Sequence, residues 1–173
     1  MKGITKICVY DFDGTLVSSP LPEQGKLAYK EKTGIDWPHE GWWSKPSSLD
    51  MTIFDIPVIN SVIESYTLEQ DNEGTLMVMM TGRLTKLSKE VEIVLTNHGL
   101  VFDKHIYNMG GSTIESKIKS LNKLLVEYPN VIDVLLTDDR VEHVPIFQKW
   151  GDSQIEQNRL TKFHINVVPT GRH

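Results

Sequence analysis

The sequence contains a single cysteine, Cys8, so the chain cannot form an internal disulfide bond. A lone cysteine agrees with a reducing compartment, and its position inside an apolar run suits a small core residue. Long apolar segments are missing as well. Residues 7–10 form only a short run before Asp11 and Asp13, and no stretch approaches the roughly 18 apolar residues that span a bilayer. We therefore expect no signal peptide, no membrane contact and a cytoplasmic location.

The chain also lacks an excess of positive charge. Charged residues make up 24% of the sequence and the net charge is -5. This balance argues against a broad basic surface for nucleic acid, although it leaves room for a local basic patch. The 39% of apolar residues is ordinary for a folded protein. A length of 173 residues suits one domain, so we expect a single domain over residues 1–173.

Five short segments have the apolar, β-rich composition of buried strands. They comprise residues 4–10, 76–80, 101–107, 131–136 and 163–168. Apolar stripes at helical spacing lie between them, over residues 84–95, 114–128 and 141–150. Ser112 and Glu115 have the spacing of a capping box before the second of these helices. The alternation predicts a three-layer, Rossmann-like α/β fold around a mainly parallel five-stranded sheet.

Residues 17–75 form a long interval between the first two predicted strands. The interval holds a weak helical pattern over residues 24–32, a tryptophan-rich segment over residues 37–43 and another helical pattern over residues 57–66. We interpret it as a small cap-like insertion that lies over the sheet edge, plus one helix that packs on the sheet. Such an insertion is too short for a large independent cap, which by analogy would let a large substrate reach the site.

Polar residues follow three of the predicted strands. Asp11 and Asp13 follow the first strand, Thr81 follows the second, and Asp138 and Asp139 follow the fourth. In a parallel sheet the carboxyl ends of the strands meet at one edge, which is where ligands bind. An isolated pair of aspartates is as often a solvated loop, but two acidic pairs at one edge favour Mg²⁺ and phosphate. A carboxylate can also act as a nucleophile and form an aspartyl-phosphate.

These positions resemble the four motifs of the haloacid dehalogenase (HAD) superfamily. Residues 11–16, with the sequence DFDGTL, resemble the first motif, and Thr81 resembles the second. Lys117, in the first turns of a predicted helix, resembles the third, and Asp138 with Asp139 resembles the fourth. All four occur in order, each in the expected structural context. The resemblance implies the HAD variant of the Rossmann-like fold.

The same resemblance implies the role of each catalytic residue. Asp11 would be the nucleophile, and Asp13 would be the general acid and base. Superfamily ATPases and dehalogenases usually lack an aspartate at the place of Asp13, so its presence favours a phosphatase. Thr81 would bind a phosphoryl oxygen, and Lys117 would neutralise charge on the nucleophile and the phosphoryl group. Lys119 is a rival for the role of Lys117, or else a solvated lysine on the same helix.

The resemblance also implies Mg²⁺ as the cofactor. Its ligands would be Asp11, the backbone carbonyl of Asp13, and the carboxylate of Asp138. Asp139 would join them directly or through water, or would instead be a structural acid. This division of labour fits phosphoryl transfer, in which positioning and charge neutralisation provide most of the catalysis.

An arginine follows each of two motifs and suggests how a substrate would bind. Gly82 and Arg83 come directly after Thr81, and Arg140 comes directly after Asp139. Arginine suits bidentate phosphate recognition, so we expect Gly82, Arg83 and Arg140 to bind substrate. The pairing resembles the 3′-phosphatase domains of polynucleotide kinase-phosphatases. The alternative is that both arginines are surface or ion-pair residues.

A closer resemblance covers more of the chain. The sequence resembles the HAD domain of Swiss Army Knife RNA-repair proteins in five segments. These are the first motif, residues 19–22 (SPLP), residues 41–43 (GWW), residues 81–83, and residues 138–140 with His143. Its implied role is the processing of RNA phosphate ends. His143 would touch substrate, or would cap or pack on its helix. The clustered Trp37, Trp42 and Trp43 would stack bases, or would pin the insertion by packing.

We therefore expect a Mg²⁺-dependent phosphomonoester hydrolase that acts through an aspartyl-phosphate, with a polynucleotide end as its candidate substrate. One alternative is a small-molecule phosphatase, for example one that acts on nucleotides. The other alternative is a phosphate-end binding module without catalysis.

Overall fold

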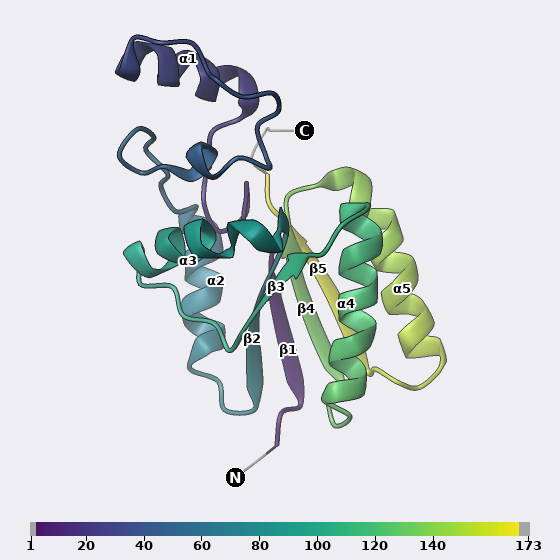
Figure 1. Cartoon of the computed structure of the whole chain (residues 1–173). Coiled ribbons are helices and arrows are strands. Elements are labelled where there is room, and N and C mark those ends of the chain that lie inside the picture. Colours follow the sequence, from purple (N-terminus) through teal and green to yellow (C-terminus); the bar gives the residue numbers. More distant parts are fainter. Residues whose placement is uncertain (1–2, 170–173) are drawn as a thin grey trace.

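The protein, a computed structural model, is described over residues 3–169, so the first two and last four residues of the predicted domain lie outside the description. Figure 1 shows a central sheet with helices on both faces, which confirms the predicted α/β fold. The strands are β1 (Lys6–Tyr10), β2 (Thr75–Leu84), β3 (Lys104–Asn108), β4 (Asp133–Asp138) and β5 (Lys162–Val167). The α-helices are α1 (Pro22–Thr33), α2 (Asn60–Gln70), α3 (Ser88–Asn97), α4 (Thr113–Glu127) and α5 (Val144–Glu156). Short 3-10 helices are η1 (Pro46–Leu49), η2 (Thr85–Leu87) and η3 (Val141–His143).

The sheet has five parallel strands in the order β3-β2-β1-β4-β5. Strand β1 is central, and its last residue, Tyr10, pairs with Met79 of β2 and Thr137 of β4. Because the strands are parallel and in register, their carboxyl ends reach the same edge. The residues that follow β1 and β4 are therefore brought side by side.

The alternation of side chains along β1 divides the core into two layers. Cys8 and Tyr10 pack with residues of α2 and α3, whereas Ile7 and Val9 pack with residues of α4 and α5. Successive side chains of a strand point to opposite faces, and each face is covered by a pair of helices (Figure 1). Cys8 is fully buried, as expected for a small core residue, and burial raises the pKa of its thiol to about 12.

The predicted end of the second strand, at residue 80, is wrong. Strand β2 continues through Thr81, Gly82 and Arg83 to Leu84. Its register with β3 shifts between Met80 and Leu84, after which Leu84 pairs with Asn108. Residues 81–83 therefore belong to an irregular extension of the strand and do not form a loop.

The start of the third strand was predicted too early. Strand β3 begins at Lys104, and residue 101 is exposed. Asp103 explains the difference, because its carboxylate accepts a hydrogen bond of 2.8 Å from the backbone N–H of Met77. The N–H of Asp103 donates in turn to the Met77 carbonyl at 2.8 Å, so a side-chain oxygen replaces only the backbone acceptor of the Met77 N–H before regular pairing starts.

Helix α4 begins where the sequence indicates, with Ser112 as its N-cap residue in an extended conformation. The predicted capping box does not form, since within residues 3–169 the Ser112 side chain makes no capping hydrogen bond. Backbone groups still close the first turn, because the N–H of Ser116 donates to the carbonyl of Ser112 at 3.0 Å. The same described range holds no helix with both the length and the apolar character needed to cross a bilayer.

The segment between β1 and α2 lies beyond the carboxyl edge of the sheet, with α1 outermost (Figure 1). Its buried apolar side chains share one hydrophobic cluster with Tyr10 of β1. These side chains are Phe12, Leu16, Val17, Trp42, Leu49, Phe54 and Ile56. The segment is therefore anchored on the core that also supports the strand-end loop.

Candidate active site

Three carboxylates converge at the carboxyl edge of the sheet. Asp11 follows β1, Asp138 ends β4 and Asp139 follows it. Each offers one oxygen, these oxygens lie within 4.8 Å of one another, and all three residues are buried. Carboxylate oxygens at such spacing are hard ligands that suit Mg²⁺.

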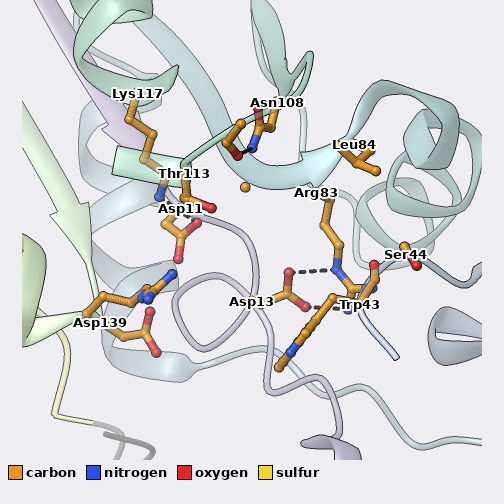
Figure 2. Close-up of a pocket in the computed structure, with 13 residues that line it drawn as sticks. Asp11, Asp13, Trp43, Ser44, Arg83, Leu84, Asn108, Thr113, Lys117 and Asp139 are labelled. Carbon is orange, nitrogen blue, oxygen red and sulfur yellow. Dashed lines mark hydrogen bonds and ion pairs between the residues drawn. The ribbon is translucent and has the colours of Figure 1, made fainter. Parts of the chain in front are cut away.

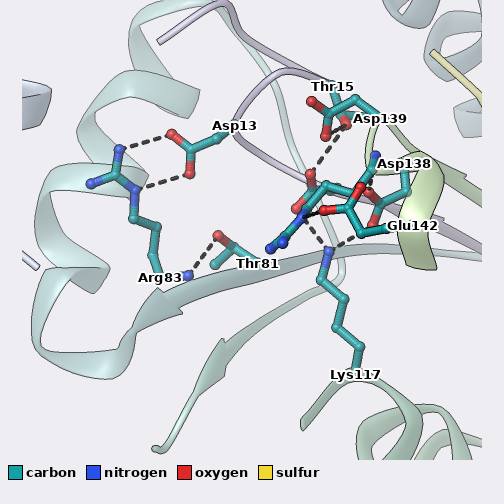
Figure 3. A network of polar contacts seen from close by, with 10 residues as sticks. Asp13, Thr15, Thr81, Arg83, Lys117, Asp138, Asp139 and Glu142 are labelled. Atoms are coloured by element: carbon teal, nitrogen blue, oxygen red, sulfur yellow. Dashed lines mark hydrogen bonds and ion pairs between the residues drawn. The ribbon is translucent and has the colours of Figure 1, made fainter. Parts of the chain in front are cut away.

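Lys117 of α4 bridges two of these acids. Its ammonium donates to Asp11 Oδ1 at 2.9 Å and to Asp138 Oδ2 at 2.7 Å (Figure 3). Burial by itself would lower the pKa of Lys117, but the two carboxylates outweigh it and raise the pKa above its usual value. Lys119, on the same helix, is exposed, so the geometry favours Lys117 for the role inferred from the third motif.

The pKa of Asp11 is set by burial and by the charged residues around it. Burial raises the pKa of Asp11 well above its usual value; Lys117 opposes this effect, whereas Asp138 and Asp139 add to it. The Thr15 hydroxyl donates to Asp11 at 3.2 Å, which fixes its second oxygen. Three buried acids against the single charge of Lys117 form a donor set that fits a divalent cation.

The carboxylate of Asp13 points elsewhere. Its two oxygens accept hydrogen bonds from Arg83 (Figure 3). Oδ1 also accepts one from the Ser19 hydroxyl. The Asp13 side chain is 18% exposed and does not join the acidic cluster that the described residues form. The carboxylates of Asp11, Asp138 and Asp139 are therefore placed to bind a metal ion, whereas the carboxylate of Asp13 is bound to Arg83.

Arg83 is buried and engaged on several sides. Besides Asp13, its guanidinium donates at 2.8 Å both to the backbone carbonyl of Trp43 and to the Ser48 hydroxyl. It also lies 4.9 Å from the centre of the Trp43 ring. Arg83 thus connects β2 with the loop after β1 and with the segment between β1 and α2. It forms an ion pair, which was the alternative to substrate binding in the sequence analysis.

Thr81 and Gly82 are neighbours in β2, and both lie close to the acidic cluster. Thr81 is buried, and its hydroxyl oxygen accepts a hydrogen bond of 3.0 Å from the N–H of Arg83. Gly82 approaches Thr113 so closely that a Cβ at this position would lie 2.7 Å from Thr113 Cγ2. A glycine is therefore needed for β2 to run this close to the start of α4.

The two residues singled out after the fourth motif differ in exposure. Arg140 is half-buried, its N–H donates to Asp138 Oδ1 at 3.0 Å, and its Nε donates to Glu142 at 2.8 Å. His143 is buried with its ring edge-on to Phe147. This agrees with the alternative in which His143 packs on its helix. Its Nδ1 has no hydrogen-bond partner within the described part of the chain.

A cavity of about 450 Å³ opens above these groups (Figure 2). It brings together most of the predicted site residues, namely Asp11, Asp13, Gly82, Arg83, Lys117, Asp139 and Arg140. Five further lining residues were not predicted as site residues from the sequence, namely Ser44, Leu84, Asn108, Gly111 and Thr113. None of them belongs to a sequence motif. Thr113, however, is the first residue of α4, one turn before Lys117, and this position is a signal by which it could have been predicted.

The three clustered tryptophans have different surroundings. Trp42 is 3% exposed, and its indole N–H donates to the backbone carbonyl of Pro20 at 3.1 Å. Trp37 packs between Tyr29 and Trp42, with ring centres 5.1 and 4.6 Å away. Trp43 is 41% exposed and lines the cavity. Packing thus accounts for Trp37 and Trp42 but not for Trp43.

Known structures share this fold. A chain of the Pnkp1/Rnl/Hen1 complex is similar with a TM-score of 0.56 and 17% identity, over 95% of this chain and 47% of that one. The HAD domain of effector protein Lem4 from Legionella pneumophila has a TM-score of 0.58 and 14% identity, over 99% and 90%. An archaeal beta-phosphoglucomutase from Pyrococcus has a TM-score of 0.51 and 13% identity, over 86% and 83%. The HAD fold is thereby confirmed.

The sequence also matches relatives. The uncharacterized protein YMR265C of Saccharomyces cerevisiae is 26% identical over 194 residues, which cover 96% of this chain and 41% of the yeast protein. The chain therefore spans less than half the length of that relative. Residues 27–173 match the family described as "HAD domain family 1 in Swiss Army Knife RNA repair proteins". Asp11 and Asp13 precede the matched range, so their assignment depends on the strand-end geometry. The chain belongs to this HAD family of Swiss Army Knife RNA repair proteins.

Proposed function

We propose that the protein is a Mg²⁺-dependent phosphomonoester hydrolase that acts through an aspartyl-phosphate on Asp11. The observation that carries the proposal is the bridge of Lys117 between Asp11 and Asp138, beside Asp139 and beneath an open cavity. A buried lysine on a buried carboxylate holds a nucleophile in place and neutralises charge where a phosphate would arrive. HAD proteins are typically hydrolases and phosphatases, which agrees with this arrangement.

Two carboxylates would share the chemistry. An oxygen of Asp11 attacks phosphorus and forms an acyl-phosphate bond, while the bond from phosphorus to the leaving oxygen breaks. For this step Asp13 would be protonated on an oxygen released from Arg83, and it would then give that proton to the leaving oxygen. The Asp13 carboxylate then takes a proton from water, whose oxygen attacks phosphorus, so that inorganic phosphate leaves and Asp11 returns to a carboxylate. Mg²⁺ held by Asp11, Asp138 and Asp139, with the backbone carbonyl of Asp13, would offset charge on the phosphate oxygens.

We further propose phosphorylated polynucleotide ends as the substrate. Support comes from the family, whose proteins are described as RNA repair proteins, and from the similar chain in the Pnkp1/Rnl/Hen1 RNA repair complex. Half-buried Arg140 lines the cavity beside Asp139, where it could pair with a second phosphate. Gly82 and Arg83 would shape the substrate side of the same cavity.

Hydrolysis of p-nitrophenyl phosphate tests the reaction. We expect turnover with Mg²⁺, none with EDTA, and a loss of more than about 10³-fold in Asp11→Asn, because the nucleophile is gone. Asp36→Asn is the matched control, since Asp36 is an exposed acid in the segment between β1 and α2 and should keep full activity. Activity that survives both EDTA and Asp11→Asn would overturn the mechanism.

A substrate panel tests the second step of the proposal. 3′- and 5′-phosphorylated oligonucleotides are compared with mononucleotides at equal concentration. A higher kcat/KM for the oligonucleotides supports end processing. Equal or better turnover of mononucleotides would point instead to a small-molecule phosphatase, and tight oligonucleotide binding without turnover would point to a binding module.

A further inference from the structure

We infer that Trp43 is the platform on which the terminal base of the substrate stacks, so that the site recognises phosphate attached to a base-bearing nucleotide. The inference deepens the proposed function and depends on it. It starts from a contrast between neighbours, because Trp42 is buried at 3% exposure while Trp43 is exposed at 41%. The exposed ring of Trp43 lines the same cavity as Asp11 and Asp13, so a substrate held there can reach it.

The ring of Trp43 is held in place from two directions. Its backbone carbonyl accepts a hydrogen bond from Arg83, and the Arg83 guanidinium lies against the ring at 4.9 Å from its centre. The preceding residue, Trp42, anchors the chain through its hydrogen bond to Pro20. A cation on an aromatic ring adds a favourable contact, and the ring therefore loses little further freedom when a planar group stacks on it.

The position of Trp43 corresponds to the leaving-group side of the site. Figure 2 shows Lys117 and Asp11 toward one end of the cavity and Trp43 and Ser44 toward the other. Arg83 contacts both Asp13 and Trp43, so the ring lies beside the carboxylate that would protonate the leaving oxygen. The group attached to that oxygen would then extend along the ring of Trp43.

The chemistry of the ring indicates the class of that group. Every nucleobase has a flat aromatic face, and stacking on a fixed aromatic side chain is sequence-tolerant. We therefore expect a preference for a terminal base over no base, with little preference among the four bases. An aliphatic alcohol phosphate has no such face and would gain little from Trp43.

The test uses two 3′-phosphorylated oligonucleotides that differ only at the terminal nucleotide, which either carries its base or is abasic. For the wild type we expect a higher kcat/KM with the base present. Trp43→Ala should lower kcat/KM for the base-bearing substrate by about 10-fold or more, while the abasic substrate changes by less than about 3-fold. Trp43→Phe should keep most of the preference, because phenylalanine retains a stacking face.

Trp37→Phe is the matched control, because Trp37 packs inside the same segment and should leave both substrates unaffected. Equal losses on both substrates in Trp43→Ala would show that Trp43 only supports Arg83 and Asp13, and would overturn the inference. No loss on either substrate would overturn it as well.

Binding separates this inference from the proposed reaction. With Asp11→Asn as the background, fluorescence anisotropy gives Kd for the same two oligonucleotides with and without Trp43→Ala. A base preference that disappears with Trp43 supports the platform even if no turnover is found, in which case only the proposed function fails. No base preference in binding would overturn the platform while leaving the phosphatase proposal intact.

Discussion

The two carboxylate oxygens of Asp13 are each held by a different nitrogen of Arg83. Nε lies 2.9 Å from Oδ2 and Nη2 lies 2.8 Å from Oδ1, which makes a bidentate pair. The third guanidinium nitrogen reaches across to Trp43 and Ser48. One buried arginine therefore fixes both the orientation of the proposed acid and the segment that walls the cavity.

Replacing Arg83 should affect stability and chemistry together. Arg83→Ala leaves Asp13 without its bidentate partner. Because the Asp13 side chain is 18% exposed, we expect a loss of about 2–3 kcal/mol of unfolding free energy, less than the roughly 3–5 kcal/mol of a fully buried pair. Arg83→Lys should recover only part of the loss, because an ammonium cannot donate to both carboxylate oxygens in a planar fork. Urea denaturation measures the stability. If both variants are as stable as the wild type, Arg83 does not have this structural role.

The same variants should change which leaving groups are tolerated. A misplaced Asp13 matters most when the leaving oxygen needs a proton, so turnover of an alkyl phosphate should fall about 10²-fold or more. Turnover of p-nitrophenyl phosphate, whose leaving group needs little protonation, should fall much less. The ratio of the two rates is the measurement, and an unchanged ratio would contradict a role for Arg83 in positioning Asp13.

Removal of Lys117 should strongly destabilise the protein. Lys117→Met leaves Asp11 and Asp138 as buried acids without their shared partner, at a cost of about 3–5 kcal/mol. Because the folded-state pKa of Lys117 is raised, its contribution is fully present at neutral pH and is lost only as the pH rises through that value. Lys119→Met is the matched control on the same helix and should change the stability by less than about 0.5 kcal/mol.

Mg²⁺ should stabilise the folded protein through the acidic cluster. Ligand that binds only the native state adds about 2.7 kcal/mol at 100 times its Kd, so the melting temperature should rise with Mg²⁺ and fall with EDTA. Asp138→Asn should remove this dependence, since it takes away a carboxylate of the cluster. Asp152→Asn on α5, an exposed acid, should retain it. A shift in melting temperature that persists in Asp138→Asn would place the metal elsewhere.

The affinity for Mg²⁺ should depend on pH at values above those usual for aspartate. Burial and its acidic neighbours raise the pKa of Asp11, so its proton competes with the metal at higher pH than an ordinary carboxyl would allow. Below that pKa, affinity should fall by up to about tenfold per pH unit for the one proton released. Titration calorimetry across a pH series measures this slope. Asp11→Asn should flatten it, and an equally steep slope in that variant would assign the proton to another group.

The close approach of Gly82 and Thr113 gives a steric test. Gly82→Ala would place a Cβ within 2.8 Å of two Thr113 side-chain atoms, so β2 and the start of α4 must move apart, at a cost of about 1–3 kcal/mol. Because α4 carries Lys117, activity should fall too. The double variant with Thr113→Ala should recover stability, and no recovery would mean that the clash lies elsewhere.

Much of the site could be predicted because it depends on periodicity and topology. Strand ends in a parallel sheet meet, which places Asp11 beside Asp138 without knowledge of any side-chain contact. Helix phase explains Lys117, since it lies four residues before buried Leu121 and so faces the sheet, whereas Lys119 is turned away.

The partner of Asp13 could not be predicted in the same way. Arg83 lies 70 residues away in sequence, and its contacts with Trp43 and Ser48 depend on the path of an irregular segment. Such a path follows from the packing of individual side chains and leaves no repeating pattern in the sequence. The prediction that β2 stops at residue 80 failed for a related reason, because its extension depends on a register shift against β3.

The shared core of the segment between β1 and α2 has a consequence for turnover. Swinging this segment away would expose Trp42, Leu49, Phe54 and Ile56 to water, at roughly 1.5–3 kcal/mol for each side chain. An opening of that cost would be rarely populated. We therefore expect the segment to act as a fixed wall and not as a hinged lid, so that a substrate would enter an already assembled site.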